Sequence, residues 1–356
     1  LTSPYELTCA LADHAAVNET VTLAGRRLAG FVNAVLREAI RQGKRLPLPP
    51  KEPLTGWIAV RYSVHPALAE RLCADLGGAK TVSLLAALET PPPLTLRVNT
   101  LRTTREKLLD VLKERGFDAR PTAGSTQGIL LPAGAPVREL PGFDAGLFFV
   151  QDEASQLAVE ALEAEPGMRV LDVCACPGSK SFGIALEMEN RGEVLAGDLH
   201  ASKLSLVADG ARRLGIGILS TLERDARSPL PAWEGTADRV LCDVPCSGLG
   251  MLAAKPELRY KKAGELAGLP ALQRAILENA ARYVKTGGRL VYSTCTVNTA
   301  ENEGVTAAFR AAHPELRPVT PAVFAGHPLQ TDGSVINLPL TAGEHGFYVA
   351  TFQKMW

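Results

Sequence analysis

Short apolar segments alternate with amphipathic segments from about residue 147 to the end of the chain. The apolar segments predict strands at 168–173, 192–198, 237–243, 287–293 and 346–352. Between them, 202–215 and 272–284 repeat apolar residues every three to four positions, which predicts helices. Strands connected through helices run parallel, so residues 146–356 are expected to form a doubly wound, Rossmann-type α/β sheet.

The first 145 residues have a different pattern. Residues 1–43 are predicted to be helical, and their apolar residues share one face at helical spacing: Leu28, Phe31, Val32, Val35, Leu36 and Ile40. The basic, proline-rich segment 44–53 predicts a short stiff linker. Residues 54–145 mix helical and strand-like pieces, which predicts a small α+β module. The predicted domains are therefore 1–46, 54–145 and 146–356.

Composition places the chain among ordinary globular proteins. It has 356 residues, of which 46% are hydrophobic and 21% are charged. We find no apolar stretch of membrane-spanning length, no signal peptide and no paired cysteine framework among the seven cysteines. These features predict a cytoplasmic, monomeric protein.

Charge is unevenly distributed although the net charge is zero. Residues 1–150 contain 18 Lys and Arg against 14 Asp and Glu, and segment 26–61 contains eight basic residues and two acidic ones. This segment is either an RNA-facing patch or a solvated helix face followed by a linker. The charge would suit DNA as well as RNA, so it does not identify the nucleic acid.

Acidic residues follow several predicted strands at the edge where ligands bind in doubly wound sheets. Asp172 precedes a tight loop with Pro177 and Gly178 that leads into a helix, but this loop matches neither the phosphate-binding P-loop nor the three-glycine dinucleotide motif. Asp198 could bind the hydroxyls of a ribose, Asp225 could accept from an adenine amino group, and Asp243 ends a later strand. Their order along the chain favours an adenosine-type cofactor.

Two cysteines, Cys246 and Cys295, follow neighbouring predicted strands. A thiolate that adds to carbon 6 of a pyrimidine makes carbon 5 nucleophilic enough to attack a methyl group, and this is covalent catalysis. A nearby cation would favour the thiolate, and Lys180 is the candidate. A second cysteine could assist release of the product. Spacing alone does not decide which of the two attacks.

The other cysteines are predicted to have structural roles. Cys9, Cys73 and Cys242 are expected in the core, whereas Cys174 and Cys176 are expected to be small side chains beside the cofactor loop. Their spacing matches no zinc framework, so no metal site is predicted.

Five segments together resemble the Nol/Nop/Sun family of RNA cytosine-5 methyltransferases. Segments 149–181, 241–260 and 287–303 are similar to its signature motifs, and 61–72 with 91–121 is similar to its small RNA-binding module. Segment 5–38 further resembles the NusB-like helical domain of the RsmB branch, which acts on 16S ribosomal RNA. The resemblance implies a Rossmann-type methyltransferase domain, a small RNA-binding module and a partial NusB-like domain.

The resemblance also implies the cofactor, the substrate and the residue roles. It implies that S-adenosylmethionine donates a methyl group to carbon 5 of a cytosine in ribosomal RNA, with Cys295 as nucleophile, Cys246 in product release and Asp243 between cofactor and base. The implied cofactor site comprises Cys174, Ala175, Cys176, Pro177, Gly178, Ser179, Lys180, Asp198, Lys203, Asp225 and Asp243.

Several positions depart from the family pattern. Cys176 and Ser179 stand where alanine and glycine are usual, Arg224 stands where glycine is common, and Ala253 and Ala254 stand where basic residues are common. Two alternatives therefore remain at this stage. One is a non-catalytic RNA-binding or ribosome-assembly factor with the same fold, and the other is a DNA cytosine methyltransferase.

Overall fold

The computed structural model describes residues 13–43, 48–325, 327–337 and 345–356. The described residues form two compact units, one with 13–43, 48–91 and 252–266, the other with 92–251, 267–325, 327–337 and 345–356. The division into three domains at residues 46, 54 and 145 stays a prediction.

The larger unit contains an eight-stranded sheet with the order β10-β12-β9-β8-β5-β6-β7, in which β11 pairs with β12. Five strands are parallel: β5 (Arg169–Asp172), β6 (Glu193–Asp198), β7 (Leu219–Glu223), β8 (Ala237–Asp243) and β9 (Val284–Thr294). The others are antiparallel: β10 (Leu316–Pro318), β11 (Val335–Asn337) and β12 (Phe347–Lys354). The Rossmann-type sheet is confirmed, but its last predicted strand runs antiparallel to β9.

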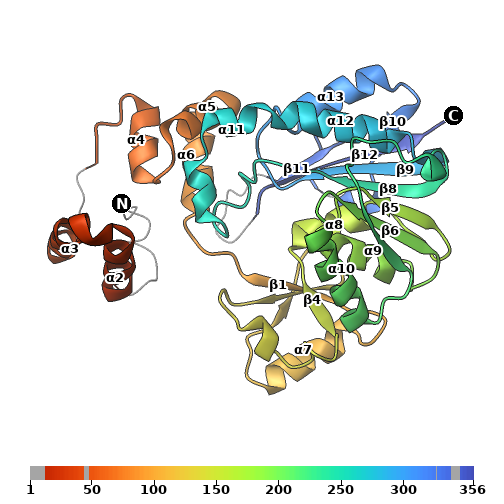
Figure 1. Cartoon of the computed structure of the whole chain (residues 1–356), viewed down its shortest axis with the longest axis horizontal. Helices are drawn as coiled ribbons and strands as arrows, with labels where there is room; N and C mark the ends of the chain where they lie inside the picture. The colour runs from red at the N-terminus through yellow and green to blue at the C-terminus, as the bar shows by residue number, and fades with distance from the viewer. Residues whose placement is uncertain (1–12, 44–47, 326, 338–344) are drawn as a thin grey trace. The chain divides into compact units, whose positions relative to one another are not determined.

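Helices cover both faces of this sheet (Figure 1). One group is α8 (Glu153–Glu160), α9 (Ser179–Glu187) and α10 (Ala201–Leu214), and the other is α12 (Leu269–Ala281) and α13 (Glu303–Ala312). Each group packs on its own hydrophobic cluster: Val159 and Ile184 belong to the first, Leu277 and Phe309 to the second, and all four are fully buried. Two 3₁₀ turns, Pro231–Trp233 and Ala322–Phe324, complete this part.

Residues 92–150 form a smaller antiparallel sheet of order β2-β3-β1-β4. Its elements are β1 (Leu94–Val98), α7 (Arg105–Glu114), β2 (Arg120–Pro121), β3 (Gly128–Leu131), the 3₁₀ turn Val137–Glu139 and β4 (Phe148–Val150). Leu108 and Leu112 of α7 pack with Leu96 and Ile129 of the sheet, so one face of the sheet is covered. This agrees with the expected mixture of helix and strand.

The other unit is helical apart from its turns. Its helices are α2 (Asp13–Leu23), α3 (Gly25–Arg41), α4 (Leu54–Arg61), α5 (Pro66–Leu76) and α6 (Gly78–Ala87), with the 3₁₀ turn Pro256–Tyr260 and the start of α11 (Ala263–Ala267). The fully buried Arg259 donates hydrogen bonds of 2.8 Å to the carbonyls of Tyr62 and Leu88. A residue distant in sequence therefore fixes the turns after α4 and α6.

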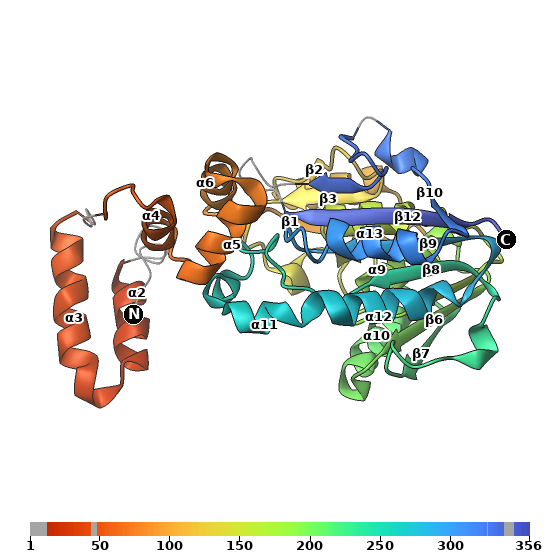
Figure 2. The same ribbon diagram turned by 90° about the horizontal axis from the view of Figure 1, so that it is seen from above.

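The helices α2 and α3 lie side by side (Figure 2). The six apolar residues that were predicted to share one face of α3 are only partly buried. Leu36 is buried, and Val32 and Ile40 pack with it, whereas Leu28, Phe31 and Val35 are exposed. A single neighbouring helix can cover only part of so broad an apolar stripe. Cys9 and the linker residues 44–47 lie outside the described residues.

A buried arginine joins the small sheet to the larger domain. Arg97 of β1 is fully buried, and it pairs with Glu187 of α9 and donates to Oε1 of Gln151 at 3.3 Å. Gln151 in turn donates to the carbonyl of Ser179 at 3.2 Å. This chain of contacts connects the strand β1 to the first residue of α9.

We predict that Arg97→Met destabilises the protein by about 2 kcal/mol, because Gln151 and Glu187 lose a charged donor although Glu187 can still be hydrated. Urea unfolding would measure this change in the free energy of unfolding. Arg120→Met, at an exposed position of β2, is the matched control. Equal stabilities of the two variants would contradict the prediction.

Candidate functional site at the carboxyl ends of the parallel strands

The loop after β5 leads directly into α9. Gly178 has φ of 108°, in the left-handed region, and an added Cβ there would lie 2.7 Å from a ring carbon of Phe182. Glycine is therefore required at this turn for both conformation and space. Ser179 begins α9 without a positive φ, so this departure from the family pattern causes no strain of the glycine type.

Asp172 lies at the end of β5 and is 1% exposed. Its Oδ2 accepts from the hydroxyl of Ser181 at 2.6 Å, whereas Oδ1 has no hydrogen-bond partner within the described part of the chain. The pKa of Asp172 is raised to about 7, chiefly by burial; the hydrogen bond from Ser181 opposes this shift and the charge of Asp243 contributes to it. A buried acceptor without a partner is therefore available beside the loop.

Asp198 ends β6, the next strand of the sheet. Its Oδ2 accepts from the backbone N–H of Cys176, and its Oδ1 accepts from that of His200, both at 3.1 Å. The carboxylate therefore holds the loop after β5 against the start of α10. Lys203 is exposed on the first turn of α10. Burial and Asp198 raise the pKa of Cys176, and the positive charge of Lys203 opposes this increase.

Asp225 follows β7 and pairs with Arg227. The guanidinium Nη2 of Arg227 lies 2.6 Å from Oδ2 of Asp225, and its Nε contacts both carboxylate oxygens. These hydrogen bonds lower the pKa of Asp225 to about 2. The adjacent Arg224 donates to the carbonyl of Ser228 and to the hydroxyl of Tyr283, so this second departure from the family pattern has a structural role in its loop.

Lys180 and Asp243 connect α9 to the end of β8. Lys180 Nζ lies 2.7 Å from Asp243 Oδ2, and Asp243 Oδ1 accepts from the hydroxyl of Ser293 at 2.6 Å. Burial lowers the pKa of Lys180, but the charge and hydrogen bond of Asp243 outweigh this and raise it, and the charge of Cys295 adds to the increase. Lys180 is therefore protonated, and its positive charge interacts with Cys295.

The structure brings the two cysteines of interest together. Cys246 follows β8, Cys295 follows β9, and their sulfur atoms are 3.2 Å apart. Cys295 is exposed and Cys246 is half-buried. The hydrogen bond to Cys295 raises the pKa of Cys246 well above its ordinary value, and burial acts in the same direction. Cys246 is thus the protonated partner, and its S–H can donate to the Cys295 sulfur.

The remaining cysteines are in different surroundings. Cys242 is fully buried in β8. Burial raises the pKa of Cys174 well above its ordinary value, and burial together with Asp198 raises the pKa of Cys176 to about 12. Both therefore stay protonated beside the loop. Cys73 is half-buried in α5.

Two residues near these loops, Gln151 and Glu301, were not among the predicted site residues. Gln151 contacts Ser179, and Glu301 accepts a hydrogen bond from the loop of Cys246. Both lie inside segments that carry the family resemblance, and this resemblance was the signal that could have found them. Their partners are distant in sequence, so their roles could not be read from spacing.

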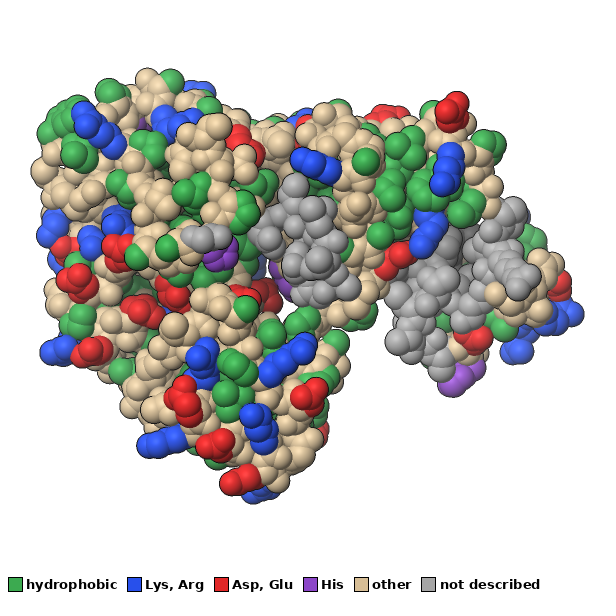
Figure 3. Space-filling view, turned by 180° about the vertical axis from the view of Figure 1, so that it is seen from behind, with side chains coloured by type: hydrophobic (Ala, Val, Ile, Leu, Met, Phe, Trp, Pro, Cys, Tyr) green, Lys and Arg blue, Asp and Glu red, His purple; other side chains and the backbone are tan. Residues whose placement is uncertain are grey.

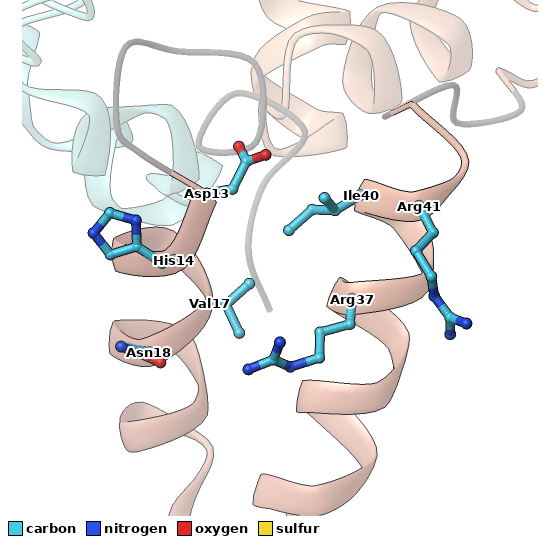
Figure 4. A pocket seen from close by; sticks show the side chains of 7 residues that line it. All are labelled: Asp13, His14, Val17, Asn18, Arg37, Ile40 and Arg41. Atoms are coloured by element: carbon cyan, nitrogen blue, oxygen red, sulfur yellow. The ribbon is translucent and has the colours of Figure 1, made fainter.

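Other features of the described chain carry no predicted site residue. A pocket of about 410 Å³ between α2 and α3 is lined by Asp13, His14, Val17, Asn18, Arg37, Ile40 and Arg41 (Figure 4).

Ala253 and Ala254 lie in a turn, and Ala254 is exposed. Acidic and basic side chains are interspersed over the lower lobe, residues 92–150, in Figure 3. Among the described residues, no helix has the length and apolarity of a membrane span and no cluster suits a metal ion.

We predict a pH-dependent stability effect at Asp172. Its pKa in the folded protein, about 7, exceeds the ordinary value of 3.8, so its contribution to stability is present below about pH 4 and is lost as the pH rises through 7. Asp172→Asn should therefore gain up to about 4 kcal/mol relative to the parent between pH 4 and pH 8. Urea unfolding across this range measures it.

Ser181→Ala is the companion variant for this measurement. It removes a hydrogen bond that lowers the pKa of Asp172, so the loss of stability should extend to higher pH than in the parent. A difference between Asp172→Asn and the parent that stays constant with pH would contradict the assignment.

Comparison with known proteins identifies the family of the chain. Residues 159–353 match the family model of 16S rRNA methyltransferase RsmB/F, and 65–138 match that of the ferredoxin-like domain of RsmF/B-like methyltransferases. A Bacillus subtilis relative, described as a probable ribosomal RNA small subunit methyltransferase B, is 35% identical over 96% of this chain and 78% of its own length. Ribosomal RNA small subunit methyltransferase B of Pseudomonas syringae pv. tomato is 34% identical over 96% of this chain and 77% of its own.

A solved structure gives the same result at the level of the fold. The crystal structure of PH0851 superimposes on this chain with a TM-score of 0.82 at 27% sequence identity. The matched region covers 97% of this chain and 78% of the PH0851 chain. The chain therefore belongs to the RsmB/F family of 16S rRNA methyltransferases.

Proposed function

We propose that this protein uses S-adenosylmethionine to methylate carbon 5 of a cytosine in 16S ribosomal RNA through a covalent bond between Cys295 and the base. The observation that carries the proposal is the 3.2 Å separation of the Cys246 and Cys295 sulfurs beside the Lys180–Asp243 pair. Two thiols in one exposed site, one of them near a cation, suit addition to and elimination from a pyrimidine ring.

The residues at the strand ends fit the cofactor. Asp172 offers a buried acceptor without a partner, and the half-buried carboxylate of Asp198 ends the second strand, where a ribose binds in sheets of this type. Together with residues 174–180, Lys203, Asp225 and Asp243, they would hold S-adenosylmethionine. When bound, this cofactor supplies a methyl group on a positively charged sulfur.

The side chains of the protein would have separate roles in the reaction. The Cys295 thiolate adds to carbon 6 of the cytosine, and Lys180 stabilises that thiolate. After carbon 5 has gained the methyl group, a base removes the proton from carbon 5, the carbon–sulfur bond breaks and the thiolate leaves. Cys246 assists this release, because its proton can pass to the departing Cys295 sulfur. Ribosomal RNA as the substrate would place the reaction in the cytoplasm.

We predict opposite effects for the two cysteines. Cys295→Ala should abolish methylation and form no covalent complex with RNA. Cys246→Ala should allow attack but leave protein trapped on RNA, visible as a slow band in denaturing gels. Cys73→Ala, in the helix α5, is the control and should behave as the parent does. Stable adducts with Cys295→Ala and none with Cys246→Ala would reverse the two roles.

Cofactor binding provides a separate prediction. Asp198→Asn should weaken the affinity for S-adenosylmethionine at least about tenfold, because the amide cannot replace a charged acceptor for two hydroxyls. Calorimetry would measure the dissociation constant, with Asp209→Asn on the exposed face of α10 as control.

If the parent protein fails to bind S-adenosylmethionine at millimolar concentration, the non-catalytic alternative is favoured. Parallel methyl-transfer assays on RNA and DNA test the other alternative.

A further inference from the structure

Glu301 is a fully buried carboxylate between the two cysteine loops. Its Oε2 accepts from the backbone N–H of Ser247 at 2.8 Å and from Nε2 of Gln273 at 2.8 Å. Its Oε1 accepts from Nδ2 of Asn298 at 2.7 Å. All three partners are donors, which matches a group that only accepts. They come from the Cys246 loop, from α12 and from the Cys295 loop.

Other contacts join the same segments around Glu301. Gln273 also donates to the carbonyl of Pro245 at 3.0 Å, so α12 holds the Cys246 loop from behind. The hydroxyls of Ser247 and Thr296 are 2.6 Å apart, and the hydroxyl of Tyr292 donates to the carbonyl of Glu301 at 2.6 Å. The Glu301 carboxylate contacts all three segments, and Gln273 supports it by donating to both loops from α12.

We propose that Glu301 is a positioning residue whose carboxylate joins the loops of Cys246 and Cys295 and keeps the two sulfurs within reach of one pyrimidine ring. This inference rests on the proposed function, because it explains how both cysteines serve one base. Parallel neighbouring strands bring the loops close. The backbone N–H groups of Val244 and Gly250 donate to the carbonyls of Ser293 and Cys295 at 3.2 and 3.0 Å, and the contacts of Glu301 add side-chain links between the same loops.

The charge of Glu301 acts in the same sense as its contacts. The hydrogen bond that Cys246 donates to Cys295 is the largest cause that raises the pKa of Cys246, burial is the next, and the charge of Glu301 adds to both. Cys295 also interacts electrostatically with the cation of Lys180. The charge of Glu301 therefore favours the thiol at Cys246, which is the proton donor that release of the product requires.

The distance between the sulfurs can be tested on the protein alone. Phenylarsine oxide bridges two nearby thiols by forming two sulfur–arsenic bonds with loss of water, and no oxidant is needed. The parent should be bridged between Cys246 and Cys295, as mapped by peptide mass spectrometry, and Cys246→Ala should lack this bridge. Glu301→Gln should lower the affinity for the bridging reagent about tenfold, because a charge-assisted hydrogen-bond set is lost.

Glu278→Gln is the matched control, since Glu278 forms a surface ion pair with Arg274 on α12. It should be bridged as the parent is. Gln273→Met keeps the Glu301 carboxylate but removes one of its hydrogen-bond donors. Its loss of affinity for the bridging reagent should be smaller than that of Glu301→Gln, and it provides the test if Glu301→Gln does not fold. Bridging equal to the parent in either folded variant at Glu301 or Gln273 would overturn the proposal.

Steady-state kinetics separates positioning from general instability. In Glu301→Gln, kcat should fall about tenfold with the KM for RNA and for S-adenosylmethionine unchanged, and covalent protein–RNA complexes should accumulate because release is slowed. An unchanged kcat would contradict the proposal. If the parent itself neither methylates nor forms adducts, the proposed function fails, whereas the bridging experiment still reports on Glu301.

Discussion

The ion pair between Lys180 and Asp243 connects the two parts of the candidate site. Lys180 belongs to the first turn of α9, just after the loop that is proposed to hold the cofactor, and Asp243 ends the strand that leads to Cys246. Ser293 ties the same carboxylate to the strand that leads to Cys295. A single partly buried carboxylate thus joins three segments, and charge-assisted hydrogen bonds give it the strength to do so.

The parallel sheet makes this convergence possible. The strands β5, β6, β8 and β9 all point their carboxyl ends toward the same edge, where backbone ladders end and loops begin. Residues that are more than a hundred positions apart in the sequence, such as Asp172 and Cys295, therefore belong to one region. The rigid strands fix where each loop starts, and side-chain contacts such as those of Glu301 then fix where each sulfur lies.

The small sheet is connected to this region by polar contacts as well as by the chain. Arg97, Gln151 and the carbonyl of Ser179 form a line from β1 to the start of α9. Burial of a guanidinium is costly unless its charge is paired, and Glu187 supplies that pair, while Nε of Arg97 has no hydrogen-bond partner within the described part of the chain. These contacts join the small sheet to the first residue of α9.

The sequence by itself determined the Rossmann-type sheet, the existence of most strands and helices, and the set of residues at the strand ends, because periodicity and strand-end chemistry are local properties. It did not reveal that the last strand is antiparallel, that half of the apolar face of α3 is exposed, or that Asp225 pairs with Arg227. Nor did it reveal the contacts of Gln151 and Glu301. Only the tertiary structure decided these features, because burial, strand pairing and the distance between two sulfurs depend on partners distant in the chain, and the local pair of Asp225 with Arg227 depends on the conformation of the loop after β7.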